Sequence, residues 1–146
     1  MLTPNETLER TAALINVLSL EAATPGQVAE VLRAHGETGE LALSARDMDG
    51  LRASARALRE VFTAEGTAAA ASAVNRLLRR STGRLRLTSH DGTTPWHPHL
   101  DRRDDAPWGE WFLASSCLAL AVRLWDRQRA ARGGVPGGGG GVGVVV

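Results

Sequence analysis

Apolar residues repeat at three- and four-residue steps over most of this chain, which is the period of amphipathic helices. A residue type that caps helices stands before each repeat. Thr3 and Thr24 are each followed by a proline and then by Glu or Gln at the third position, while Ser44, Thr67 and Asp105 precede the other repeats. The sequence therefore predicts five helices. Glycines close the second, third and fourth of them.

The period changes once, between residues 84 and 100. In the segment RLRLTS the arginines and leucines alternate, so they face opposite sides of a strand. Asp91-Gly92 is a strong hairpin signal, and a return arm follows from Trp96 to Leu100, where two prolines restrict it to an irregular or edge strand. A two-stranded ribbon is marginal in isolation, so we expect it to pack on the helices. The predicted fold is α+β and mostly α, with about five helices and one small β-hairpin near 84–100.

The length of 146 residues fits one domain, and the net charge of +1 gives no basic field that would indicate nucleic acid. All 17 basic residues are arginines interspersed with acids, which favours GC-rich coding over phosphate recognition. The single cysteine, Cys117, excludes an internal disulfide. The N-terminus lacks the pattern of a signal peptide, and the apolar runs are too short to span a membrane. We therefore expect a cytoplasmic protein without a membrane partner.

Residues 88–111 hold three of the four histidines and three of the four tryptophans. His97 and His99 share one face of an extended strand, and His90 precedes the turn, so it can lie nearby across the hairpin. Three histidines can bind zinc, but local hydrogen bonding explains them equally well. Because the sequence shows neither cysteine partners nor groups to orient the imidazoles, we expect no metal here.

Carboxylates follow the histidines. Asp101, Asp104 and Asp105 alternate with arginines, and paired carboxylates can perform acid–base chemistry. A solvated loop before a helix explains the same residues, and we prefer it. Cys117 lies in an apolar helical stretch and is interpreted as a small buried side chain, not as a nucleophile. The sequence therefore predicts no catalytic residue and no enzyme.

The tryptophans can stack on bases, but their helical spacing favours a role in the core. We interpret the cluster as a structural seam that seats the last helix on the hairpin, built from Asp91, Gly92, Trp96, His97, His99, Trp108 and Trp111.

One local group of basic residues is a candidate for contacts with nucleic-acid phosphates. It consists of Arg76, Arg79, Arg80, Arg84 and Arg86. A solvated helix end is the alternative that we prefer, because the small net charge leaves little affinity for DNA.

The ordered set of segments LRASARALREVF, VNRLL, HDGTTPWHPHL and DDAPWGEWFLASSCLALAVRL resembles the ABATE domain over roughly residues 7–128. This domain forms the N-terminal half of CGNR zinc finger proteins, whose members are described as stress-induced transcription regulators. The resemblance implies a regulatory domain followed by a cysteine-rich zinc ribbon that binds DNA.

The chain departs from that pattern after the segment LWDRQRA, where it continues as ARGGVPGGGGGVGVVV. Only Cys117 is present, so no all-cysteine zinc site can form within the chain. We expect zinc, and with it DNA binding, only in relatives that keep the ribbon, and no cofactor here. Residues 1–132 then form the domain and 133–146 a disordered tail, produced by a frameshift or a truncation.

Three functions remain open at this point. The first is the regulatory half of a transcription regulator, which senses an unknown small-molecule effector. The second is a homodimeric interaction module without DNA binding. The third is a metal-dependent enzyme centred on His90, His97 and His99.

Overall fold

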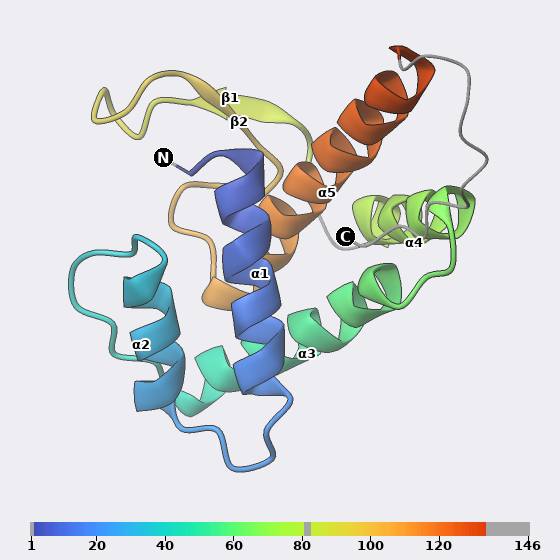
Figure 1. The fold of residues 1–146 in the computed structure, drawn as a ribbon. Coiled ribbons are helices and arrows are strands. Elements are labelled where there is room, and N and C mark those ends of the chain that lie inside the picture. Colours follow the sequence, from blue (N-terminus) through green and yellow to red (C-terminus); the bar gives the residue numbers. More distant parts are fainter. Residues whose placement is uncertain (1, 81–82, 134–146) are drawn as a thin grey trace.

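The computed structural model describes residues 2–80 and 83–133. Figure 1 shows them as a ribbon. This part of the chain confirms the predicted class, with five helices and one two-stranded antiparallel sheet. The order is α1 (Pro4–Leu18), α2 (Pro25–Ala34), α3 (Ala45–Phe62), α4 (Thr67–Arg80), β1 (Arg86–Thr88), β2 (His97–His99) and α5 (Trp108–Gly133). Apart from Gly133, the predicted Gly- and Val-rich tail lies outside the described residues.

The first three helices begin at the predicted caps. In α1 the Glu6 N–H donates to the Thr3 hydroxyl at 3.2 Å, and the Thr3 N–H donates to the Glu6 carboxylate at 2.7 Å. The same reciprocal pair opens α2 and α3. These bonds satisfy backbone donors that have no partner within the helix. Local sequence alone therefore determines where these helices start.

Helix α4 begins one residue earlier than predicted, and α5 begins later. The Ala70 N–H donates to the Gly66 carbonyl at 3.1 Å, so Thr67 is already inside α4. The Trp111 N–H donates to the Pro107 carbonyl at 3.0 Å, which places Asp105 outside α5. A residue that precedes proline avoids helical geometry, and this shifts the start of α5 beyond the predicted cap.

The helices enclose one core. Helix α3 packs on α5, α1 lies against both, α2 packs on α1, and α4 packs on α3 and α5 (Figure 1). Burying a leucine or phenylalanine side chain contributes about 1.5–3 kcal/mol, so this core is the main source of stability. Its largest fully buried apolar side chains are Phe112, Leu14, Leu32, Leu51, Leu58 and Leu120.

Helix α5 is the longest element, with 26 residues. Cys117 is fully buried within it, as predicted, and burial raises the pKa of its thiol to about 12. Trp125 lies outside the core: it is 63% exposed, with the Arg129 guanidinium 5.4 Å from the ring centre. No described helix combines the length and apolarity that crossing a membrane requires.

The hairpin has short strands and a wide loop. Arg86 pairs with His99 and Thr88 with His97, and residues 89–96 connect the two strands. Asp91-Gly92 forms the turn of this loop, as predicted, because the Thr93 N–H donates to the His90 carbonyl at 3.3 Å across these two residues. Three successive residues have positive φ there, at 49° for His90, 57° for Asp91 and 83° for Gly92. Such backbone is unusual for residues other than glycine, and it turns the chain back toward the helices.

The polar side of the hairpin faces the helices. Leu85 and Leu87 are 66% and 64% exposed, whereas Thr88 is buried and Arg86 is mostly covered. The alternation predicted from RLRLTS is therefore present, but the leucines point to solvent. The physical reason is that the covered side carries the ion pairs and hydrogen bonds described below, so its polar groups have partners.

Helices α3 and α5 approach each other through two glycines. A Cβ built on Gly109 would lie 2.7 Å from the Gly50 carbonyl carbon and oxygen. The Ser54 hydroxyl donates to the Gly109 carbonyl at 2.8 Å across the same contact. A Cβ on Gly50 would meet its nearest neighbour, the Gly109 Cα, at an ordinary 3.7 Å. The close approach therefore requires glycine at one position only.

We predict that Gly109→Ala lowers the free energy of unfolding by about 1–3 kcal/mol, because the two backbones must separate to admit the methyl group. Gly50→Ala should instead leave the protein as stable or up to about 1 kcal/mol more stable, since alanine is the better helix former. Urea denaturation followed by circular dichroism measures both. Equal effects of the two substitutions would contradict the asymmetry.

Candidate functional site

A cavity of about 980 Å³ lies between the hairpin, the first turns of α1, the loop after α2 and the first half of α5. Its walls combine two indoles from α5, three imidazoles from the hairpin, and aliphatic and hydroxyl groups from α1 and α5. They also carry the imidazole of His35 and the charged side chains of Arg10, Glu37, Asp101 and Asp104. Pockets for small molecules typically measure about 300–1,000 Å³ and are mostly apolar with a few polar groups. This cavity therefore has the size of a small-molecule site, and its walls carry more polar and charged side chains than such sites usually do.

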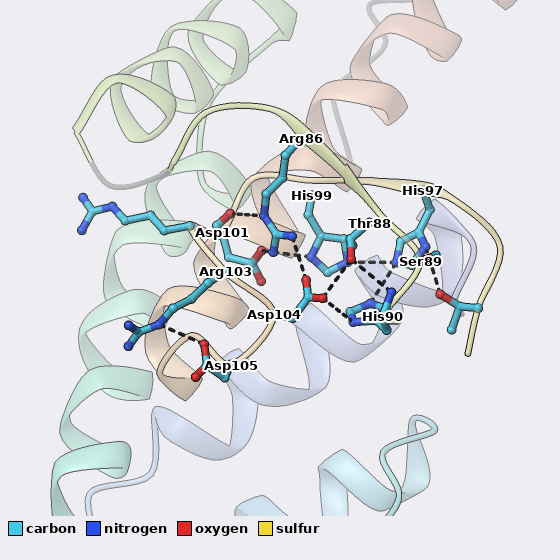
Figure 2. A network of polar contacts seen from close by, with 12 residues as sticks. Arg86, Thr88, Ser89, His90, His97, His99, Asp101, Arg103, Asp104 and Asp105 are labelled. Atoms are coloured by element: carbon cyan, nitrogen blue, oxygen red, sulfur yellow. Dashed lines mark hydrogen bonds and ion pairs between the residues drawn. The ribbon is translucent and has the colours of Figure 1, made fainter. Parts of the chain in front are cut away.

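The three imidazoles meet beneath the hairpin (Figure 2). The Nε2 atoms of His90 and His97 are 3.2 Å apart, and those of His97 and His99 are 2.9 Å apart. Strand alternation brings His97 and His99 to one face, and the left-handed loop brings His90 to the same place. This confirms that His90 lies across the hairpin from the other two.

Each imidazole also has an acceptor at its other nitrogen. His97 Nδ1 lies 2.7 Å from the Pro95 carbonyl oxygen, and His99 Nδ1 lies 3.0 Å from an Asp101 carboxylate oxygen. His90 Nδ1 lies 3.5 Å from an Asp104 carboxylate oxygen. An Nδ1–H directed at an acceptor fixes both the ring orientation and the tautomer. The orienting groups that the sequence did not reveal are therefore present.

Arg86 holds the two carboxylates in place (Figure 2). Its guanidinium lies 2.6 Å from an Asp101 oxygen and 2.7 Å from an Asp104 oxygen, and it also donates to the Asp101 carbonyl at 2.9 Å. The Thr88 hydroxyl donates to Asp104 at 2.9 Å. A guanidinium presents several donors in a fixed plane, which allows one arginine to orient two acids.

These contacts determine the charge of both carboxylates. Burial alone would raise the pKa of Asp101, but hydrogen bonds from His99 and Arg86 outweigh it and the pKa is lowered. Hydrogen bonds from Arg86 and Thr88 lower the pKa of Asp104. Burial opposes the charge of Arg86 as well, yet the two acids raise its pKa. All three groups are therefore ionised at neutral pH.

Arg10 lies on another wall of the same cavity and is 4% exposed. Its Nη2 donates to the Ser115 hydroxyl at 2.8 Å, and its guanidinium lies 4.3 Å from the centre of the Trp111 ring. Its Nε is buried without a hydrogen-bond partner among the described residues. Burial lowers the pKa of Arg10 to about 10, although Glu37 acts in the opposite direction. Arg10 is therefore a buried cation at neutral pH that forms no ion pair with a carboxylate in the described part of the chain.

The structure brings together part of the predicted seam. His97, His99, Trp108 and Trp111 are half-buried and line the cavity, with the two indoles edge to face at 5.2 Å between ring centres. A cavity therefore separates much of the hairpin from α5, where the sequence had predicted direct packing.

The other three predicted seam residues do not take part. Asp91 and Gly92 are exposed at the end of the loop, and Trp96 is 72% exposed. The reason is the alternation that places His97 and His99 beneath the hairpin. Residues 96 and 98 then point outward.

The five arginines of the predicted basic group do not share one surface. Arg76, Arg79, Arg80 and Arg84 are exposed, and Arg76 lies 3.7 Å from Glu60. Arg86 differs from these four arginines. It faces inward and is occupied by two carboxylates, so it offers nothing to a phosphate.

Two important residues were missed by sequence reasoning. Asp101 was assigned to a solvated loop, but it is 2% exposed and part of the site. Its spacing of two from His99, which itself follows His97 by two, is the signal that it shares their face. Arg10 occupies a position on the buried stripe of α1, between Thr7 and Thr11, and a charged residue on such a stripe marks an unusual site.

Comparison with known proteins adds one finding. The model of the ABATE family, described as "Putative stress-induced transcription regulator", matches residues 5–131. No C-terminal zinc-ribbon domain is detected. No curated protein and no solved structure matches the chain.

We predict that Asp101→Asn lowers the free energy of unfolding by about 2 kcal/mol at pH 7, because Arg86 and His99 lose a buried charged partner. The folded-state pKa of Asp101 lies below its unfolded value, so its contribution is complete above about pH 4 and is lost as the pH falls through the folded pKa. The difference in the free energy of unfolding between wild type and variant should therefore become smaller as the pH falls below about 4. Chemical denaturation between pH 3 and pH 7 measures it.

Asp105→Asn is the matched control. Among the described residues its carboxylate pairs only with the exposed Arg103, at 3.0 Å, so the substitution should leave stability nearly unchanged at every pH. A loss at Asp105 as large as that at Asp101 would contradict the assignment of the network.

Proposed function

Because the chain belongs to the ABATE family, we propose that it is the domain of a cytoplasmic transcription regulator that senses a small-molecule effector. The family description supports the regulatory setting, and the cavity beneath the hairpin offers a place for the effector. The observation that carries the proposal is Arg10, a buried cation on the wall of this cavity that forms no ion pair with a carboxylate of the described residues, although Glu37 acts on it from a greater distance.

The chemistry of the walls suggests the class of effector. A buried charge is costly unless it is paired, so a bound anion would stabilise the guanidinium of Arg10. Trp108 and Trp111 line the same cavity and offer flat apolar surfaces. A small molecule with an acidic group and a flat apolar body, such as an aromatic carboxylate, would satisfy both features.

Sensing fits the site better than catalysis. The Cys117 thiol is buried and its pKa of about 12 keeps it protonated, so it is no nucleophile. Asp101 and Asp104 are held by Arg86, and this leaves them poorly suited to exchange protons with a substrate. We therefore propose that the domain is not an enzyme.

DNA contact, in this proposal, belongs to the zinc ribbon of relatives that carry one. The exposed arginines Arg76, Arg79, Arg80 and Arg84 would neutralise few phosphates, and the net charge of the chain is only +1. The logarithm of the binding constant falls with the logarithm of the salt concentration with a slope of about 0.9 per neutralised phosphate. Because few phosphates would be neutralised, this surface would bind DNA weakly at physiological salt.

We predict that benzoate, a minimal aromatic carboxylate, raises the midpoint of thermal unfolding of the wild-type protein. At a concentration of about ten times its Kd the expected gain is about 1.4 kcal/mol, or roughly 3–5 °C for a domain of this size. Differential scanning fluorimetry measures the shift. Arg10→Met should abolish it, because the variant keeps the volume but removes the charge.

Benzamide is the control ligand, since it has the same ring without the negative charge. Arg10→Met should itself stay folded, because replacing an unpaired buried charge with an apolar side chain of similar volume is often neutral or stabilising. An equal shift by benzamide, or a benzoate shift that survives Arg10→Met, would rule out anion recognition by Arg10.

A second function is favoured by the outer face of the hairpin. Leu85, Leu87 and Trp96 are all more than 60% exposed there, and Pro98 between the strand residues is exposed as well. Grouped apolar side chains on a surface are typical of interaction sites. We propose a second copy of this chain as the occupant, because two identical ribbons related by a two-fold axis would each cover the other's leucines.

We predict that the wild-type protein sediments increasingly as a dimer when its concentration rises from about 1 to 100 µM, a range in which interfaces of modest area associate. Leu87→Glu should keep it monomeric. Leu20→Glu is the matched control, because Leu20 is 55% exposed in the loop after α1, away from the hairpin. A wild-type monomer at all concentrations, or a dimer unaffected by Leu87→Glu, would refute this interface.

A further inference from the structure

We propose that His90, His97 and His99 bind one divalent transition-metal ion, with zinc as the first candidate, through their three Nε2 atoms. The ion would lie beneath the hairpin, at the wall of the cavity. The inference rests on where these nitrogens point and on what holds them there. It does not depend on the identity of the effector.

The spacing of the nitrogens fits a tetrahedral metal. Zinc binds imidazole nitrogen at about 2.0–2.1 Å, which places two ligands of a tetrahedral site about 3.3–3.4 Å apart. The Nε2 atoms of His90 and His97 are 3.2 Å apart, those of His97 and His99 are 2.9 Å apart, and the ligand atoms of all three lie within 4.8 Å of one another. Small rotations of the rings bring all three pairs to the required distance.

With each histidine proton on Nδ1, the close approach of the three Nε2 atoms is unfavourable unless a cation lies between them. Pro95 offers only a carbonyl, and the Asp101 and Asp104 carboxylates each pair with the Arg86 guanidinium, so each of these groups accepts a hydrogen bond. The proton of each imidazole therefore belongs on Nδ1. Three Nε2 lone pairs then face one another at close range. A metal ion satisfies all three at once, because neutral imidazole nitrogens are its ligands.

The surrounding groups match those of metal sites. Imidazoles that bind a metal commonly donate their other N–H to a carboxylate or a backbone carbonyl, and this fixes the ring and makes the ligand more basic. All three histidines have such a partner. Arg86 in turn anchors both carboxylates at 2.6 and 2.7 Å. Two carboxylates and one guanidinium leave a local charge of −1, which also favours a divalent cation.

The fourth coordination position opens toward the cavity. The three rings are half-buried, and they line the same space as Arg10 and Trp111. Three protein ligands with one exchangeable position leave room for a water molecule or a small anion. If the proposed function holds, an acidic effector could occupy this position as well as contact Arg10. Binding of the metal itself needs no effector.

The test is a metal titration of the tag-free full chain after treatment with a chelator. Isothermal titration with zinc should give one ion per chain with a Kd of about 1 µM or tighter. Cobalt as a substitute should give the visible absorption of a tetrahedral ion. The double variant His97→Gln/His99→Gln should weaken zinc binding at least 100-fold. Asp101→Asn, which leaves the ligands in place, should weaken it about 10–100-fold.

His35→Gln is the matched control, because His35 is the fourth histidine and lines the same cavity outside the cluster. It should change the affinity less than threefold, and circular dichroism would establish that each metal-free variant is folded. Absence of zinc binding by wild type, or equal losses in the double variant and His35→Gln, would overturn the site. Benzoate binding measured in the presence of chelator fails or succeeds independently of this result.

Discussion

The two ion pairs of Arg86 are the constraint on which the hairpin and the histidine cluster depend. A ribbon of two three-residue strands has little stability of its own, and its leucines face solvent. Its attachment comes from the polar side, where one guanidinium joins the strand β1 to Asp101 and Asp104 in the connection to α5. Because both acids also orient imidazoles, the contact that fixes the hairpin also shapes the histidine cluster.

The cavity thus has two walls of different character. On one side Arg10 is a buried cation that contacts an indole face and a hydroxyl group, with Glu37 acting on it electrostatically. On the other side three imidazoles are backed by two carboxylates and a backbone carbonyl. A site with a fixed positive group opposite a cluster of electron-pair donors is suited to bridging by an acidic molecule and a cation together. The indoles Trp108 and Trp111 connect these walls through the first turns of α5.

Sequence periodicity and capping predicted the helices well, because both are local properties. Thr3, Thr24 and Ser44 marked their helix starts correctly, and the period-two pattern located the hairpin. Which side of the hairpin faces the core was not predictable, since it depends on Arg86 meeting Asp101 and Asp104 from another segment. The same long-range contact explains why Trp96 was misplaced. The role of Arg10 is likewise invisible locally, because it needs Ser115 and Trp111 from the far end of the chain.

The paired glycines at the crossing of α3 and α5 give the fold a mechanical property. Gly109 is the second residue of α5, and its backbone lies against that of Gly50 with no Cβ on either residue to separate them. Beyond this contact α5 continues for 24 residues to Gly133, or about 36 Å at 1.5 Å per residue. Tilting α5 by roughly 5° about this contact would move its C-terminal end by about 3 Å, while the indoles close to the contact would move by a small fraction of that distance. A tilt at this contact would therefore turn a small shift beside the cavity into a larger displacement at the far end of α5.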